Sequence, residues 1–332
     1  MSPEVGPPRV GLGCAQLGNL YTAMSDETAL ACVETAWDAG VRYFDTAPHY
    51  GLGLSERRLG AALRGRPRDA FTVSTKVGRL LERNLHPTGR DTEGFEVPDD
   101  LVRRWDFSAA GITASVAGSQ ERLGLDRIDI LLAHDPDLRP ATHAQFLAEG
   151  APALEALRAV GRVGAVGVGT NSAEAAYEYV TSADLDVVMI AGRFNLLDHS
   201  ALDGLLDECA RRGISVVNVG AFASGVLANP TPSAASHFRY ELASPEVLAR
   251  VSAIAGVCAA FGTTLPRVAL AFAASHPAVA SVTLGASRPE HVRRNVQLAA
   301  SPQPPAGVWG ALAEAGLLDA EVVERLRLGS PG

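Results

Sequence analysis

The sequence predicts a (β/α)8 barrel, and three observations carry that prediction. Short runs rich in β-branched residues alternate with segments of helical period, and this pair recurs eight times along the 332 residues. Several of the runs are apolar at nearly every position, which is typical of parallel strands buried on both faces. Ionisable side chains follow successive runs at their carboxyl ends, where the active residues of such barrels gather.

Eight strands are expected from these runs. They lie at residues 9–14, 41–46, 71–77, 128–134, 163–169, 186–191, 214–219 and 279–284. Eight strand-helix units in series favour a closed barrel.

Amphipathic helices are expected between the strands. The first, at 26–39, places Leu30, Val33 and Trp37 on one face, begins after Ser25 as its N-cap and ends at Gly40. The same reasoning predicts helices at 55–64, 108–123, 145–160, 173–182, 200–212, 246–261 and 288–299.

A doubly wound open sheet is the structural alternative, and it would need a phosphate-binding G-x-G-x-x-G. Three stretches come near to that pattern. In each of them another residue stands where the third glycine would be. It is Gln16 in the stretch that begins Gly11-Leu-Gly13, Glu56 in the one that begins Gly51-Leu-Gly53, and Ser172 in the one that begins Gly167-Val-Gly169. The barrel is therefore the preferred fold.

A single domain is predicted for residues 1–332, because composition does not change along the chain and no internal linker is visible. The barrel core is expected at about 9–300, followed by a helical tail. The longest irregular segment, 78–105, follows the third strand. Such a long segment is expected to be a functional loop over one face of the barrel.

Charge and cysteine usage exclude several classes of protein. The net charge is −8 and no basic run is longer than a pair, so neither nucleic acid nor an anionic membrane is an expected partner. The N-terminus does not read as a signal peptide, and the apolar region 251–286 is interrupted by Arg267, His276 and two prolines. The four cysteines are Cys14, Cys32, Cys209 and Cys258. Their spacing is not that of metal ligands, so we expect no metal site. We also expect a reduced, cytoplasmic protein.

The carboxyl ends of the predicted strands carry a group of chemically reactive side chains. Asp45 ends the second strand, Lys76 the third, His134 the fourth and Asn171 follows the fifth, while Tyr50 lies in the loop just beyond Asp45. Each alone has an ordinary structural explanation, such as helix capping, core packing or a long side chain that reaches solvent. Together, on consecutive strands, they are expected to meet at one rim of the barrel.

Proton transfer is the chemistry that such a set supports. A tyrosine has a pKa of about 10, which must fall by about three, or roughly 4 kcal/mol, for exchange near neutrality. A lysine cation beside the phenol favours the phenolate, and a carboxylate keeps that lysine charged in a poorly solvated pocket. A histidine can orient a carbonyl or hydroxyl oxygen toward the phenol. A Schiff-base lyase that uses the lysine as its nucleophile is the chemical alternative.

The motifs in this order resemble those of the aldo-keto reductase family. They are D-T-A-P-H-Y at 45–50, Lys76, the stretch I-D-I-L-L-A-H-D at 128–135 and G-V-G-T-N at 167–171, and the match covers about residues 9–300. The resemblance implies a nicotinamide cofactor and a tetrad in which Tyr50 is the general acid and base, Lys76 and Asp45 tune it, and His134 positions the substrate oxygen. It also favours a monomer. Redox-sensing regulatory subunits are known in the family too, but no added interaction domain is visible here and the tetrad is complete.

Several stretches are similar to the D-threo-aldose (L-fucose) dehydrogenase branch of that family. They are 97–108, 123–137, 189–198, 221–228 and 271–287. The resemblance implies oxidation of the anomeric carbon of free aldoses to the lactone with NAD or NADP. Reduction of a carbonyl on a specialised metabolite or a pyridoxal-type substrate remains the alternative.

The resemblance also implies where the cofactor binds. Asn171 matches the residue that holds the nicotinamide carboxamide, 222–227 the loop over the pyrophosphate, and 285–295 the stretch that holds the adenosine end. The cofactor-binding residues expected are Gly13, Cys14, Asn171, Phe222, Ser224, Gly225, Leu227, Gly285, Ala286, Ser287, Arg288, His291 and Asn295.

NAD is slightly favoured over NADP. The positions that many NADP-preferring relatives fill with basic residues hold Gly285, Ser287 and His291, which carry no fixed charge. For the substrate, His49, Trp105 and Phe107 are expected to line the mouth, because aromatic faces suit the C–H side of a sugar or a pyridine ring.

Overall fold

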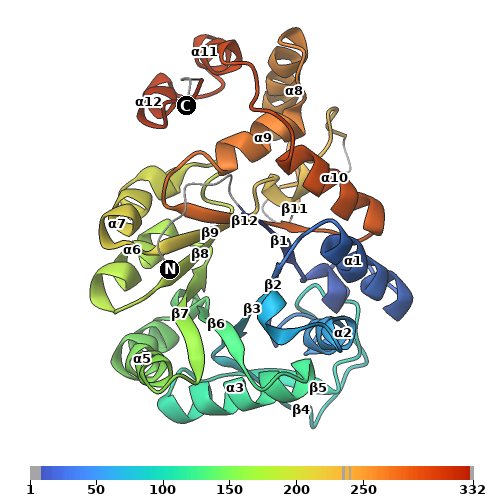
Figure 1. The fold of residues 1–332 in the computed structure, drawn as a ribbon, viewed down its shortest axis with the longest axis vertical. Helices are drawn as coiled ribbons and strands as arrows, with labels where there is room; N and C mark the ends of the chain where they lie inside the picture. The colour runs from blue at the N-terminus through green and yellow to red at the C-terminus, as the bar shows by residue number, and fades with distance from the viewer. Residues whose placement is uncertain (1–8, 234–235, 239–240, 330–332) are drawn as a thin grey trace.

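The computed structural model describes residues 9–233, 236–238 and 241–329. Eight parallel strands close into a barrel in the order β1-β12-β9-β8-β7-β6-β3-β2, with helices around them (Figure 1). The strands are β1 (Arg9–Gly13), β2 (Tyr43–Asp45), β3 (Thr72–Val77), β6 (Ile128–His134), β7 (Val163–Thr170), β8 (Val187–Ala191), β9 (Ser215–Val219) and β12 (Val279–Gly285). Every one of them falls on a predicted run, and the predicted (β/α)8 fold is confirmed.

The helices that surround the barrel follow the strands in sequence. They are α1 (Asp26–Asp38), α2 (Leu54–Leu63), α3 (Ala109–Leu123), α5 (Ala151–Ala159), α6 (Ala173–Ser182), α7 (Leu205–Arg212), α8 (Pro245–Ala260), α9 (Leu265–Ala273) and α10 (Pro289–Ala299). Ser25 caps α1 as predicted, accepting a hydrogen bond from the Thr28 N–H. The predicted buried face of α1 is wrong in part: Leu30 is 41% exposed, while Ala29, Cys32 and Ala36 are buried beside Val33. Small side chains let this helix pack close to the strands.

The sequence led us to expect an irregular loop at 78–105, but the structure forms a hairpin there. The ends of this segment form an antiparallel hairpin of β4 (Arg79–Arg83) and β5 (Leu101–Trp105), in which Arg79 pairs with Trp105. The tip is held to the loop after β1 by a bridge between Leu20 and Phe95 and by the Tyr21 N–H, which donates to the Gly94 carbonyl at 2.9 Å. A segment with its own strand pairing and an anchored tip holds its side chains in fixed positions.

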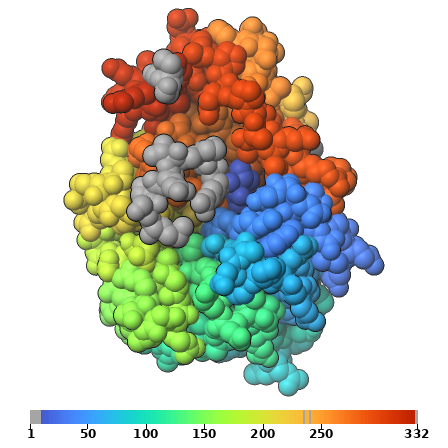
Figure 2. Space-filling view, viewed as in Figure 1, coloured from blue at the N-terminus to red at the C-terminus, as the bar shows by residue number. Residues whose placement is uncertain are grey.

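Two helical predictions differ from the structure. The expected helix at 145–160 is divided into α4 (Pro140–Gln145), a π-helical turn (Phe146–Gly150) and α5. Helix α9 was not expected at all, although seven of its nine residues are buried against the barrel. The predicted helical tail is present as α11 (Gly307–Glu314) and α12 (Ala320–Arg325), which lie with α8 at one edge of the molecule (Figures 1 and 2).

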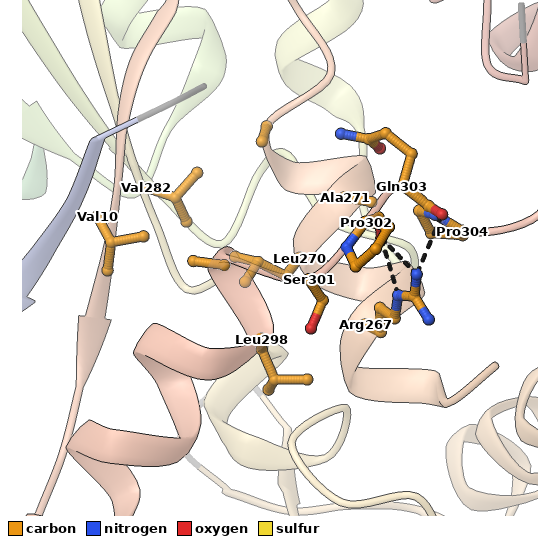
Figure 3. Close-up of a pocket in the computed structure, with 12 residues that line it drawn as sticks. Val10, Arg267, Leu270, Ala271, Val282, Leu298, Ser301, Pro302, Gln303 and Pro304 are labelled. Carbon is orange, nitrogen blue, oxygen red and sulfur yellow. Dashed lines mark hydrogen bonds between the residues drawn. The ribbon is translucent and has the colours of Figure 1, made fainter. Parts of the chain in front are cut away.

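A small cavity of about 60 Å³ lies between the barrel wall and the outer helices (Figure 3). Val10 and Val282 line it from β1 and β12, and Leu298 lines it from α10. The guanidinium of Arg267 donates to the Pro302 carbonyl from Nε at 2.9 Å and from Nη2 at 2.5 Å. This cavity is outside the ring of strands, so it does not belong to the site at the strand ends.

Candidate active site

Strand alternation directs the site residues into the barrel. Tyr43 and Asp45 are two residues apart on β2, and Asp45 pairs with Ser74 on the neighbouring β3. Tyr43 packs among Leu132, Val187, Met189 and Val217 in the interior cluster. Asp45 therefore points inward one layer above it, at the carboxyl end of the barrel, and Lys76 follows Ser74 on the same face of β3.

Lys76 is the centre of the site. Its Nζ lies 2.7 and 2.9 Å from the two oxygens of Asp45, 3.0 Å from the Thr46 carbonyl and 3.0 Å from Oη of Tyr50. Burial alone would lower the pKa of Lys76, but Asp45 and Tyr50 together outweigh it and raise that pKa. The lysine is thus a fixed cation with its donors committed, which argues against the Schiff-base alternative because a nucleophilic amine must be neutral.

Tyr50 is held by the backbone of its loop. Gly51 has a φ of +60°, and a Cβ at that position would lie 2.2 Å from the Gly18 carbonyl oxygen. The loops after β1 and β2 therefore touch, backbone to backbone, immediately beside the phenol. Glycine is required at that contact.

His134 lies perpendicular to Tyr50, with ring centroids 5.8 Å apart. Burial and the positive charges of Arg79 and Lys76 hold the pKa of His134 well below its usual value. The imidazole is therefore neutral at physiological pH. Its Nδ1 is buried and makes no hydrogen bond within the described residues.

Asp135 connects Arg79, His134 and Asn171. Its Oδ2 accepts from Arg79 Nη2 at 2.5 Å and lies 3.5 Å from His134 Nε2, and its Oδ1 accepts from Asn171 Nδ2 at 3.1 Å. The backbone of Asp135 has a φ of +45°, in the left-handed region that few residues other than glycine adopt. Asp135 and Arg79 were missed, although the acid directly after His134 was a visible signal.

The hairpin tip adds a carboxylate at the mouth. Glu93 Oε2 lies 3.6 Å from His49 Nδ1, and its Oε1 lies 3.7 Å from Arg103 Nη1. Arg103 is buried, pairs with Asp91 at 2.5 Å and donates to the His49 carbonyl at 2.9 Å. The Glu93 side chain is 45% exposed, so it faces solvent above the site. No sequence motif marked Glu93.

Two of the three predicted substrate contacts lie at the mouth. The His49 ring lies 5.3 Å from that of His134, and burial with nearby arginines lowers the pKa of His49 to about 2. Trp105 is half-buried with the guanidinium of Arg79 4.3 Å from its ring centroid. Phe107 departs from the prediction: it is fully buried in the outer core, and its backbone N–H donates to Gln145 Oε1.

The residues predicted for the cofactor surround the same rim. Ser224 and Gly225 have φ of +58° and +102°, a conformation in which backbone N–H groups can converge on an anion. Helix α10 begins after Arg288 without a side-chain cap, and its first residue is Pro289. Gly285 lies against Gln16, whose buried Oε1 has no partner within the described residues. These features fit a dinucleotide.

Some predicted cofactor contacts are less accessible. Cys14 is fully buried, its N–H donates to the Asp45 carbonyl at 2.8 Å, and burial raises the pKa of its thiol. Leu227 and Ala286 are also buried. Phe222 is half-buried. Ser287 Oγ lies 3.3 Å from His291 Nδ1. Asn295 Nδ2 donates to the Gly285 carbonyl at 3.3 Å.

In the described part of the chain, no three His, Cys, Asp or Glu side chains are grouped so as to hold a metal ion. Among those residues no single helix is long and apolar enough to cross a membrane; α8 and α9 meet that test only as a pair bent by 100°.

The chain belongs to the aldo/keto reductase family, whose family model matches residues 9–314. It is 48% identical over 314 residues to a D-threo-aldose 1-dehydrogenase from Pseudomonas, covering 94% of each chain. A pyridoxal 4-dehydrogenase from Microbacterium luteolum is 36% identical over 306 residues, covering 86% of this chain and 88% of the relative. An aldo-keto reductase from Bacillus halodurans, solved in its holo form, superposes with a TM-score of 0.70 at 26% identity, covering 96% and 95% of the two chains.

Family membership makes this chain an NAD(P)-dependent oxidoreductase that acts on a small molecule. The resemblance drawn from the motifs is thereby confirmed.

Proposed function

We propose that this enzyme oxidises the anomeric carbon of free aldoses to the lactone, with Tyr50 as the proton acceptor. The observation that carries the proposal is the lysine bridge: one buried ammonium joins the Asp45 carboxylate to the Tyr50 phenol at hydrogen-bond distance. The 48% identity to a D-threo-aldose 1-dehydrogenase over 94% of the chain supports the choice of substrate class.

The proton path begins at the C1 hydroxyl of the sugar. Tyr50 takes that proton, and the Lys76 ammonium 3.0 Å away stabilises the negative charge on Oη that makes this possible. Neutral His134 holds the same sugar oxygen toward the phenol. The nicotinamide, when bound, supplies the acceptor for the hydrogen that leaves C1 with its electron pair.

Asn171 is the proposed anchor of the carboxamide, with Phe222, Ser224, Gly225 and Leu227 near the pyrophosphate. NAD is the favoured cofactor, because Gly285, Ser287 and His291 offer no fixed positive charge to a 2′-phosphate and Arg288 alone stands near them. Gly13, Cys14, Gly285, Ala286 and Asn295 complete the proposed binding surface.

A pyridoxal-type or other aromatic aldehyde is the second candidate substrate. One observation favours it, the 36% identity to a pyridoxal 4-dehydrogenase over 86% of this chain. Carbonyl reduction would use the same residues in reverse, with Tyr50 donating the proton.

A turnover screen in both directions tests the proposal. The purified chain is assayed with NAD and NADP against D-threo-aldoses such as L-fucose, against pyridoxal and against aromatic aldehydes. The proposal expects the highest kcat/KM for an aldose with NAD, and a lactone product. Turnover of pyridoxal or aromatic aldehydes without turnover of any aldose would favour the second candidate.

We further propose a cytoplasmic monomer. All four cysteines are free in the structure, which fits a reducing compartment. Light scattering on a sizing column would give a mass near 34.6 kDa for a monomer, and twice that mass would contradict it.

A further inference from the structure

Two hydroxyl groups lie beneath the lysine bridge, and the proposed proton chemistry does not use them. Ser74 Oγ donates to Asp45 Oδ1 at 2.7 Å, and the Oη of Tyr43 lies 2.9 Å from that same Ser74 Oγ. Both residues are buried in the barrel interior. The chain of contacts therefore runs from Tyr43 through Ser74 and Asp45 to Lys76 and ends at Tyr50.

Counting protons fixes the direction of each bond. Ser74 has a single hydroxyl proton, which goes to the Asp45 carboxylate, since an ionised carboxylate can only accept. Tyr43 must then donate to Ser74. Burial, followed by the charge of Asp45, raises the pKa of Tyr43, so its phenol keeps the proton that this bond needs.

The fold makes room for this arrangement. A Cβ at Gly11 would lie 2.5 Å from Cδ1 of Tyr43, so glycine at that position lets the ring lie flat against β1. A Cβ at Gly169 would lie 3.7 Å from Cε of Lys76, at ordinary contact distance. The Tyr43 ring fills the layer directly below the site, and its hydroxyl reaches upward to Ser74.

We propose that Ser74 and Tyr43 are positioning residues that set the pH range of Tyr50 through Asp45 and Lys76. The proposal rests on the proposed function, because it assigns the pH-dependent step to Tyr50. Asp45 Oδ1 receives two donors, Ser74 Oγ and Lys76 Nζ, and shares its negative charge between them. The lysine keeps more of its positive charge uncompensated, and that charge is what stabilises the phenolate.

When the Ser74 hydroxyl is removed, Lys76 is the remaining one of the two donors to Asp45 Oδ1. The ammonium is then neutralised more completely, and it stabilises the negative charge on Tyr50 less well. For oxidation, where Tyr50 must accept a proton, the pH at which activity rises moves upward. Tyr43 acts only through Ser74, so its loss has a smaller effect in the same direction.

The test is the pH profile of kcat/KM for Ser74→Ala, Tyr43→Phe and the double variant, using whichever substrate the wild-type enzyme turns over with NAD or NADP. We expect Ser74→Ala to move the rising limb upward by about half a pH unit, which lowers kcat/KM about threefold below the limb. The double variant should match Ser74→Ala, because the two hydroxyls act in series. Cofactor dissociation constants, measured by fluorescence without turnover, should not change.

Thr75→Val is the matched control. Thr75 is the next residue on β3 and its hydroxyl donates to a buried carboxylate, Glu56, at the same 2.7 Å, but on the opposite face of the strand. The Thr75→Val variant should be less stable than the wild type, but its pH profile of kcat/KM should not shift. An unmoved profile in Ser74→Ala or Tyr43→Phe, an equal shift in Thr75→Val, or additive shifts in the double variant would overturn the inference. Absence of turnover in the wild type would instead refute the proposed function.

Discussion

The ammonium of Lys76 donates to the phenol oxygen of Tyr50 at 3.0 Å, from a position where its other donors are already bound to Asp45 and to the Thr46 carbonyl. This bond uses a lysine proton and not the phenol's own, and the His134 ring lies 5.8 Å from the Tyr50 ring. In the proposed mechanism, Lys76 stabilises the charge and Tyr50 exchanges the proton.

Replacing Lys76 by methionine should abolish turnover and destabilise the fold. The change keeps the length of the side chain but leaves the buried Asp45 carboxylate without its cation, which costs about 3–5 kcal/mol. Denaturant unfolding and steady-state kinetics measure the two effects. Asp45→Asn combined with Lys76→Met should recover much of the stability but none of the activity, and recovery of both would contradict the assigned role.

Stability should fall as the pH is lowered below about 6.5. His49 has a folded-state pKa of about 2, so between that value and its unfolded pKa the unfolded chain binds a proton that the folded chain does not. His134 contributes with the same sign. The unfolding free energy should therefore decrease with falling pH throughout this window.

His49→Gln should reduce that slope by up to about 1.4 kcal/mol per pH unit. Denaturant titrations at a series of pH values give the slope. The control variant is His86→Gln, the same substitution at an exposed histidine. Equal slopes for His49→Gln and the wild type would show that His49 is not held neutral.

Glu93→Gln should weaken the binding of polyhydroxylated substrates. The Glu93 carboxylate faces solvent at the mouth, held 3.6 Å from His49 and 3.7 Å from Arg103, where it can accept hydrogen bonds from sugar hydroxyls. We expect KM for aldoses to rise about tenfold, a loss of about 1.4 kcal/mol, with little change for an aldehyde without hydroxyls.

Glu82→Gln is the matched control for that measurement. Glu82 lies on the same hairpin and pairs with Arg104 on its exposed surface. A similar rise in KM in both variants, or a rise that does not distinguish aldoses from simple aldehydes, would exclude Glu93 as a contact for the sugar.

The barrel could be predicted from sequence because its strands are marked locally. Each β-branched run is a property of consecutive residues, and the chemistry at its carboxyl end follows from the geometry of parallel strands. Asp45, Lys76 and His134 could therefore be placed together before any coordinates, and the structure brings them together around Tyr50.

The missed features depend on pairings between distant residues. Arg79 reaches Asp135 across 56 positions and Tyr43 reaches Ser74 across 31, and neither pair has a motif. Helix α9 is rich in alanine and has a proline as its second residue, so its strong burial was not apparent from periodicity. Phe107 was placed at the mouth for its chemistry, whereas the hairpin before it turns the chain into the core.

The most direct test of the account is the turnover of Tyr50→Phe at saturating cofactor and substrate. The account predicts a loss of turnover of about 10²-fold or more, because the hydroxyl carries the proton, together with a cofactor dissociation constant within about twofold of the wild type, a difference of about 0.4 kcal/mol. Turnover equal to that of the wild type would contradict it, since the ring would then be a wall of the pocket and not its acid and base.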